Sequence, residues 1–375
     1  MTINYPISFG INKQKLLKKT LRQLAFWGIA YSLLFFTIHL HTISIFETFF
    51  TDLEISAATL PLIVLFSVLL FSPFLGLIDI ILEEDKFRNY SLGLNVITAG
   101  ALYTILLMGA ISLVRLYLLS FGKNLFLNEI SLSLLTQHWS YYFMILSVHT
   151  GSMSLIIGSV NQLSKRFGPE MLLPFFSGKY KYPREEERIF MFLDLSCSTK
   201  LAEQLGHIKY SALIKDSFLD IDKMVRKYNA EIYQYVGDEV VLSWPLEKAK
   251  NLEYIDFFYG VEQLFREKED YYKGNYTIAP VFKAGVHLGK VTAVEVGGLK
   301  KDIAYHGDTL NVAARLEGLC KIHSQPLLVS EAVYNLDNIE KRYYSTSLGA
   351  QYLKGRSNPV EVYSITKTLR KVVAA

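Results

Sequence analysis

The sequence predicts an all-α membrane half followed by an α+β half. Hydrophobic residues make up 51% of the 375 residues and the mean hydropathy is +0.23, which is high for a wholly soluble protein. This apolar excess lies in the first part of the chain, before residue 161. After residue 188, short apolar runs alternate with helical stretches, and Gly237 and Asp238 mark a tight turn between two of the runs.

Four charge-poor stretches define the first half. A helix needs about 20 apolar residues to cross the core of a bilayer, so each stretch is long enough to span it. The stretches are 24–46, 55–78, 94–120 and 139–160. The sequence therefore predicts an all-α domain of four transmembrane helices at residues 1–160, with a lipid bilayer as its partner.

Basic residues gather on one side of the predicted spans. Lysine and arginine are favoured on the cytoplasmic side of a membrane, so we expect a multi-pass protein of the cell (inner) membrane with both termini and the second half in the cytoplasm. Because these residues flank the spans, the net charge of +4 does not indicate a nucleic-acid partner. The residues concerned are Lys13, Lys15, Lys18, Lys19, Arg22, Lys86, Arg88, Lys165 and Arg166.

The fourth stretch is unusually polar for a membrane span. Small residues recur there at helical spacing, which predicts a close contact between helices. They are Ser147, Gly151, Ser154 and Gly158. His149 lies near the middle of the same stretch, where an ionisable group is a functional candidate. Together with His39, His41 and His138 it raises the alternative of a haem or another ligand between the spans, although a histidine hydrogen-bonded inside the bundle is the commoner arrangement.

The second half alternates predicted strands and helices. The expected elements are a strand at 189–195, helices through 199–228, a hairpin at 230–244, a helix within 246–268, strands around 279–295, a helix that carries Asn311 and Arg315, and strands at 326–329 and 359–364. Helices packed on a largely antiparallel sheet make an α+β domain of the ferredoxin-like βαββαβ kind. We expect this domain at 188–375, after a linker at 161–187 whose three prolines exclude one continuous helix.

Two aspartates stand where the predicted strands end. Asp194 closes the first strand, and Asp238 lies in the turn of the hairpin. Both carboxylates could face one pocket, and paired carboxylates on rigid strands suit two hard divalent cations that bridge a substrate phosphate. Further along, Asn311 and Arg315 are spaced four residues apart, which places them on one helix face. Taken alone, each feature could also have a purely structural role, such as a turn between strands or a helix cap.

Taken together, four sequence blocks resemble the catalytic domain of the class III nucleotide cyclases, the adenylate and guanylate cyclase family. The blocks are FLDLS at 192–196, the VGDE turn at 236–239, KAGVHLG at 283–289 and GDTLNVAARLE at 307–317. They occur in the family's order and at its approximate spacing. The resemblance covers residues 188–366, about half of the chain.

This resemblance implies an adenylate cyclase that converts ATP to 3′,5′-cyclic AMP and pyrophosphate by in-line attack of the ribose 3′-oxygen. It implies two Mg²⁺ (or Mn²⁺) per active site, held by Asp194, Asp238 and the backbone carbonyl of Leu195. Arg315 would stabilise charge on the α-phosphate, and Asn311 would position the ribose. Because the chain has one copy of each block, the resemblance implies a homodimer with two equivalent sites.

Substrate binding is where this chain departs from the family. Lys354 and Arg356 in the LKGR segment are candidates for the terminal phosphates, with Lys354 preferred, although such a turn is often only solvated surface. At the two positions that read the purine in the family, adenine-specific members typically carry lysine and aspartate or threonine, and guanylate cyclases carry glutamate and cysteine. This chain has Gln234 and Ala304 there. Glutamine can recognise an adenine or a guanine edge, and alanine offers no side-chain hydrogen bond. These two residues leave the choice of purine open, so ATP is expected from its prevalence in the family and GTP is the alternative.

Three other functions compete with adenylate cyclase. A guanylate cyclase is the nearest alternative, for the reason just given. A catalytically inactive cyclase-like membrane receptor is favoured by Gln234 and Ala304, and opposed by the presence of both aspartates, Asn311 and Arg315. A diguanylate cyclase lacks support, because the turn reads VGDEV without paired glycines.

Overall fold

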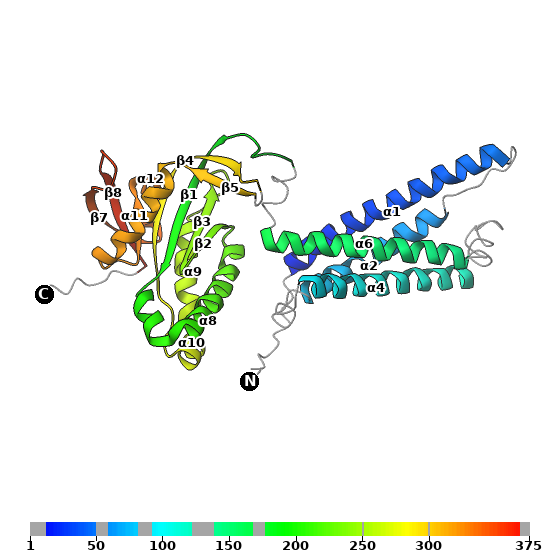
Figure 1. Cartoon of the computed structure of the whole chain (residues 1–375), viewed down its shortest axis with the longest axis horizontal. Coiled ribbons are helices and arrows are strands. Elements are labelled where there is room, and N and C mark those ends of the chain that lie inside the picture. Colours follow the sequence, from blue (N-terminus) through cyan, green and yellow to red (C-terminus); the bar gives the residue numbers. More distant parts are fainter. Residues whose placement is uncertain are drawn as a thin grey trace. The chain divides into compact units, whose positions relative to one another are not determined.

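The structure, a computed structural model, divides into two compact units, Met1–Phe167 and Gly168–Ala375 (Figure 1). It describes residues 13–49, 59–81, 92–121, 139–167, 177–249, 251–298 and 301–367. The first unit is helical, and the second is a mixed α+β domain, as the sequence predicts.

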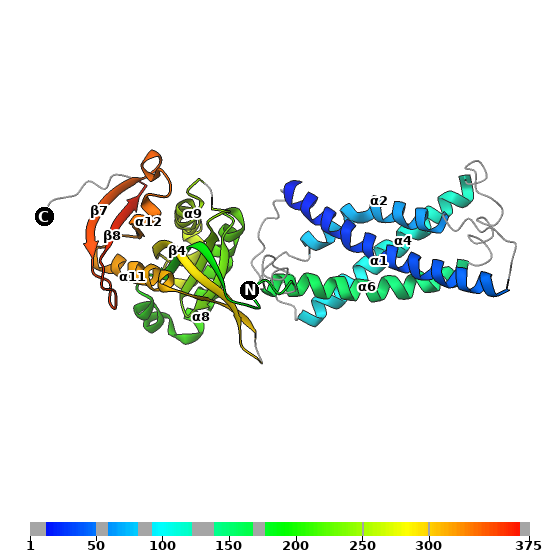
Figure 2. The same cartoon turned by 90° about the horizontal axis from the view of Figure 1, so that it is seen from above.

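Long helices lie side by side in the N-terminal unit (Figure 2). They are α1 (Lys13–Phe49), α2 (Thr59–Ile81), α4 (Leu92–Phe121) and α6 (Trp139–Phe167). Within the described residues, three segments are long and apolar enough to cross a membrane, namely Leu16–Ile38, Gly93–Tyr117 and Trp139–Gln162. Helix α2 contributes a shorter apolar segment, Ser72–Ile81. The span expected at 55–78 therefore stays a prediction, and its first residues lie outside the described ones.

A buried carboxylate joins the helices of this unit. Asp79 on α2 accepts hydrogen bonds from Arg22 at 2.9 Å and Gln23 at 2.7 Å, both on α1. It also accepts one from the hydroxyl of Tyr103 on α4, and the amide of Asn161 on α6 lies 3.5 Å away. A buried charge is tolerated only when it is paired and hydrogen-bonded, so this cluster favours one arrangement of the four helices.

Most of the predicted contact face of α6 lies against α4. Ser154 and Thr104 are hydrogen-bonded at 3.0 Å, and a Cβ placed on Gly158 would lie 3.4 Å from a backbone oxygen of α4. Ser147 lies 3.9 Å from the sulfur of Met108, whereas a Cβ on Gly151 would meet no atom within 4 Å.

The imidazole of His149 bonds within the bundle. Its Nε2 lies 3.1 Å from the carbonyl oxygen of Ala30 on α1. His138 and the side chains of His39 and His41 lie outside the described part of the chain. Among the described residues, no group of three His, Cys, Asp or Glu side chains could hold a metal ion, and the haem alternative stays a prediction.

An eight-stranded sheet forms the centre of the C-terminal unit. Its elements are β1 (Arg184–Leu195), α8 (Ser198–Lys227), β2 (Glu231–Val236), β3 (Glu239–Pro245), α9 (Glu253–Glu267), α10 (Glu269–Tyr276), β4 (Phe282–Val296), β5 (Asp302–His306), α11 (Asp308–Ile322), β6 (Leu327–Ser330), α12 (Glu331–Tyr334), η2 (Ile339–Lys341), β7 (Tyr344–Gln351) and β8 (Val360–Thr366). The strand order is β2-β3-β1-β4-β6-β8-β7, and β5 pairs with β4. The segment from β1 to β4 shows the predicted βαββαβ connectivity, with α10 added before β4. Strand β1 begins earlier than expected because its charged first residues also pair with β4.

The two faces of the sheet carry different helices (Figure 1). Along β1, Ile189, Met191 and Leu193 pack with buried residues of α8 and α9. Phe190 points to the opposite face, where it packs with Ala313 of α11 and with β5. This alternation follows from the two-residue period of a strand. Asp194 lies on the same strand face as Phe190, so the side of the sheet that α11 covers also carries the first aspartate.

Helix α11 lies unusually close to β4. A Cβ added to Gly285 would lie 2.1 Å from the backbone nitrogen of Glu317 and 2.4 Å from the carbonyl oxygen of Ala313. One added to Gly289 would lie 2.5 Å from the hydroxyl of Thr309. The glycines of the KAGVHLG block are therefore required for helix packing, and they fix the position of Asn311 and Arg315.

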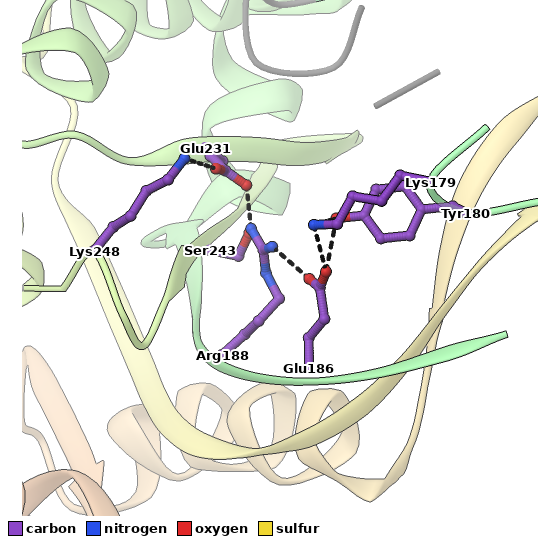
Figure 3. A network of polar contacts seen from close by, with 7 residues as sticks. All are labelled: Lys179, Tyr180, Glu186, Arg188, Glu231, Ser243 and Lys248. Carbon is purple, nitrogen blue, oxygen red and sulfur yellow. Dashed lines mark hydrogen bonds and ion pairs between the residues drawn. The ribbon is translucent and has the colours of Figure 1, made fainter. Parts of the chain in front are cut away.

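A polar network fastens the start of β1 to neighbouring strands (Figure 3). Arg188 is only 2% exposed, and its guanidinium contacts Glu231 of β2, Glu186 at 3.1 Å and Ser243 of β3 at 2.9 Å. The same guanidinium lies 4.9 Å from the ring centre of Tyr305 on β5. A buried arginine held by two carboxylates is stable only while both remain in place.

The network reaches back to the turn that precedes β1. Glu186 accepts hydrogen bonds from Lys179 at 2.8 Å and from the Tyr180 hydroxyl at 2.9 Å (Figure 3). The carbonyl oxygen of Tyr180 accepts a bond from the backbone of Glu295 on β4. Residues 177–188 are thus attached to the strands of their own unit.

Candidate active site

The structure brings the two aspartates to one end of the sheet. Asp194 pairs in register with Glu239 on β3 and with Lys283 on β4. Asp238 precedes Glu239 in the tight turn, where Gly237 has a φ of 62° that favours glycine. Both carboxylates influence the hydroxyl of Tyr210 on α8, whose pKa is raised by burial and then by the charge of Asp238.

Negative charge accumulates at this end of the sheet. The pKa of Glu239 is raised to about 7, first by burial and then by the charges of Asp194, Glu317 and Asp238. The ammonium of Lys283 lies 3.2 Å from Asp194 and 2.5 Å from Glu317 of α11. Burial lowers the pKa of Lys283, but these two carboxylates outweigh it and the net shift is upward.

Sequence reasoning assigned no role to four residues of this cluster. They are Tyr210, Glu239, Lys283 and Glu317. A signal for two of them was present, because Lys283 opens the KAGVHLG block and Glu317 closes the GDTLNVAARLE block. Their contact joins a strand to a helix much later in the chain, and a pattern in one segment does not reveal such a pair.

The two aspartates fit a divalent cation. The Oδ2 atom of Asp238 is buried and has no hydrogen-bond partner among the described residues. Leaving a buried carboxylate oxygen unpaired is costly, and a cation would remove that cost. Leu195 has its side chain in the core, so only its backbone could serve as a ligand. Because no three acidic, His or Cys side chains among the described residues form a complete shell, phosphate oxygens of a substrate would have to supply further ligands.

Asn311 and Arg315 lie on the side of α11 away from its buried stripe. Asn311 is exposed, and Arg315 is partly buried with an Nη1 atom that has no hydrogen-bond partner. Among the described residues, no hydrogen bond or ion pair joins either side chain to Asp194 or Asp238. The structure therefore does not bring the two predicted halves of the site into contact within one chain.

The LKGR turn lies beside Arg315. A Cβ placed on Gly355 would lie 3.5 Å from Nη2 of Arg315. Arg356 forms an ion pair of 3.0 Å with Asp308 at the start of α11, and Lys354 is exposed. The turn and α11 thus gather three cationic side chains, which suits a polyanionic ligand.

A partly buried histidine lies near this cationic group. His287 on β4 is 2.7 Å from the hydroxyl of Ser330. The pKa of His287 is lowered to about 4, first by burial and then by the charge of Arg356. The imidazole is therefore neutral at physiological pH and adds no charge of its own.

The two candidate purine-reading positions adjoin one aromatic cluster. Gln234 is exposed on β2 and follows Tyr233, and Ala304 on β5 precedes Tyr305. The rings of Tyr233 and Tyr305 have centres 5.1 Å apart, and Phe190 lies 5.5 Å from Tyr305. The structure thus places β2 and β5 together at this point. Tyr305 itself is buried among these rings and lies under the guanidinium of Arg188.

Comparison with known proteins identifies the C-terminal unit. The family model described as "Adenylate and Guanylate cyclase catalytic domain" matches residues 181–367. Adenylate cyclase 2 of Rhizobium meliloti (strain 1021) is 31% identical over 208 residues, which are 55% of this chain and 57% of that protein. Adenylate cyclase 1 of the same organism is 27% identical over 194 residues, which are 50% of this chain and 28% of that protein.

A solved structure shares the fold. The structure of a bacterial light-regulated adenylyl cyclase superposes with a TM-score of 0.50 at 21% identity, over 59% of this chain and 65% of the other. The matched region spans little more than half the length of the first of the curated relatives and less of the second.

Proposed function

We propose that this chain, which belongs to the adenylate and guanylate cyclase family through residues 181–367, converts ATP to 3′,5′-cyclic AMP and pyrophosphate. The observation that carries the proposal is the adjacency of Asp194 and Asp238, with the unpartnered buried oxygen of Asp238. The two curated relatives named above are both adenylate cyclases, which favours ATP as the substrate.

The residues take the following roles in the proposal. Asp194, Asp238 and the carbonyl of Leu195 would hold two Mg²⁺ or Mn²⁺ ions, which when bound would activate the ribose 3′-hydroxyl and offset the negative charge of the triphosphate. Arg315 stabilises the charge that develops on the α-phosphate, since its fork-shaped guanidinium has an Nη1 without a partner. Asn311 orients the ribose.

In the proposal, the substrate is bound by the LKGR turn and by strands β2 and β5. Lys354 binds the terminal phosphates, and Arg356, which Asp308 holds, adds positive charge beside it. Gln234 reads the purine, while Ala304 leaves room without a hydrogen bond. Because a glutamine amide can pair with either purine, GTP is the alternative substrate.

A homodimer would complete the site. Asn311 and Arg315 contact neither aspartate of their own chain, and the exposed position of Asn311 leaves it available to a second copy. In a two-fold dimer, α11 of each chain would complete the aspartate site of its partner, giving two equivalent sites. A separate monomer would then be inactive.

The N-terminal unit places the enzyme in the membrane in this proposal. The three candidate spans and the basic residues beside them favour a multi-pass protein of the inner membrane, with the catalytic unit in the cytoplasm. The proposed domains are a membrane domain at 1–160, a linker at 161–187 and a catalytic domain at 188–375. The last part of this linker, from residue 177, is attached to the strands of the C-terminal unit, and β1 begins within it at Arg184.

Product identification tests the proposal. Membranes that contain the protein are incubated with Mg²⁺ or Mn²⁺ and either ATP or GTP, and the products are identified by mass spectrometry, with Asp238→Ala as the control. We expect cyclic AMP that disappears in the control. Cyclic GMP alone would contradict the substrate assignment. The absence of any cyclic nucleotide under all four conditions would favour the inactive receptor.

A further inference from the structure

The ammonium of Lys283 lies between two carboxylates that belong to different elements. One is Asp194, at the end of β1, at 3.2 Å. The other is Glu317, on α11, at 2.5 Å. All three side chains are largely buried, with exposed fractions of 19% for Lys283, 21% for Asp194 and 11% for Glu317. The charges of these three side chains are therefore poorly screened by solvent and act strongly on one another.

A divalent cation at Asp194 would meet this ammonium directly. Lys283 contacts the Oδ2 atom of Asp194, one of the two carboxylate oxygens of this proposed metal ligand. Two cations cannot share one carboxylate without repulsion between their like charges. Lys283 would therefore have to move away from Asp194 when a metal ion binds. If it stayed in place, its charge would lower the affinity of the site for the metal ion.

Glu317 offers Lys283 a second partner at a fixed place. The backbone nitrogen of Glu317 is held against β4 by the close contact at Gly285, two residues along the strand from Lys283. A rigid backbone contact thus sets the separation between the lysine and the glutamate. Lys283 can leave Asp194 and keep its shorter ion pair with Glu317.

We propose that Lys283 and Glu317 are positioning residues that set the metal affinity of Asp194. Lys283 neutralises Asp194 while no metal is bound, and Glu317 retains the ammonium when a metal takes its place. This inference rests on the proposed function only in that Asp194 and Asp238 hold divalent cations.

The same pair links the metal site to α11. Glu317 follows Arg315 by two residues in one helix, so the ion pair of Lys283 with Glu317 holds the helix that carries Asn311 and Arg315. In the proposed dimer those two residues serve the partner's site. Metal binding in one site would thus strengthen the anchoring of the helix that serves the other.

Binding of Mn²⁺ to the full chain without nucleotide tests the proposal. Free Mn²⁺ is measured by electron paramagnetic resonance on protein in lipid nanodiscs, for wild type, Lys283→Met and Glu317→Gln. Lys283→Met should bind Mn²⁺ about three- to tenfold more tightly, because a competing cation is gone. Glu317→Gln should bind it more weakly by a similar factor, because the ammonium then rests on Asp194 alone. The opposite signs distinguish a positioning role from a general loss of structure, which would weaken binding in both.

Controls keep the test decisive. Lys290→Met removes an exposed lysine from the same strand and should leave Mn²⁺ binding unchanged. Lys283→Gln serves if the methionine variant fails to fold, and the same tightening is expected. Unchanged or weaker binding in the Lys283 variants, or a shift of the same sign in Glu317→Gln, would overturn the inference.

Asp238→Ala separates this inference from the proposed function. If wild type makes cyclic AMP and loses Mn²⁺ binding with Asp238→Ala, but the Lys283 and Glu317 variants bind Mn²⁺ as wild type does, the function stands and the inference fails. If Asp238→Ala leaves Mn²⁺ binding unchanged, the aspartates do not hold the ion and both assignments are wrong.

Discussion

At the scale of single residues, His287 shows how burial converts an ordinary side chain into a pH-dependent contribution to stability. Its pKa is lowered from 6.5 to about 4, first by burial and then by the charge of Arg356. The folded state keeps the imidazole neutral over a range in which the unfolded chain binds a proton. Acidification therefore favours the unfolded state between pH 6.5 and about 4.

We expect His287→Gln to reduce the acid sensitivity of the C-terminal unit. Relative to this variant, the wild-type unfolding free energy should fall by about 1 kcal/mol per pH unit between pH 6.5 and 4, and the two should run parallel above pH 7. Hydrogen exchange of β4 and β6 peptides in the full chain, followed by mass spectrometry across this range, measures the difference. If the unfolding free energies of the two proteins ran parallel down to pH 4, the imidazole would bind a proton as readily in the folded state as in the unfolded chain.

At the scale of elements, the contact between α11 and β4 determines where Asn311 and Arg315 lie. Gly285 leaves no room for a side chain, since an added Cβ would lie within 2.4 Å of two backbone atoms of the helix. Because these neighbours are backbone atoms of a helix, they cannot move aside as easily as the end of a flexible side chain. The geometry of the helix therefore depends on one missing methyl group.

Gly285→Ala should displace α11 and destabilise the unit by about 2–3 kcal/mol. Cyclic nucleotide formation should be lost with it, because Arg315 moves with the helix. Gly318→Ala is the matched control, since this exposed glycine of α11 has no neighbour within 4 Å and alanine is the better helix former. Thermal unfolding and product formation are compared for both. Wild-type activity in Gly285→Ala would show that the helix position is not critical.

The elements also show what could be predicted from the sequence. The adjacency of Asp194 and Asp238 depends on a strand end and a hairpin turn, which are local signals. The start of β1 was missed because Arg184 to Glu187 are charged and lie in a strand only through pairing with β4. The pairing of Lys283 with Glu317 depends on how closely α11 approaches the sheet, and residue patterns do not encode that distance.

At the scale of the whole molecule, the arrangement of the site allows a test of how many chains contribute to one active site. In the proposed dimer, each site takes its aspartates from one chain and α11 from the other. A chain with a defective Arg315 and a chain with a defective Asp238 would together form one site with both defects and one with none.

Arg315→Ala and Asp238→Ala should therefore each be inactive alone and regain activity when mixed. Random pairing makes half of the dimers mixed, so we expect about a quarter of wild-type activity in co-expressed membranes. Membranes with either variant alone, at the same protein level, are the control for residual activity. No recovery in the mixture would mean that both groups act within one chain.

The anchoring of residues 177–188 has a consequence for how such enzymes can be assembled. Lys179, Tyr180, Glu186 and Arg188 make their contacts with strands of the C-terminal unit, and these contacts need nothing from the helices before them. The C-terminal unit therefore contains all the residues that hold the segment by which the preceding chain enters it. A different N-terminal module joined ahead of the turn at Ser177 would find the same attachment, so the C-terminal unit is built to be exchangeable between modules.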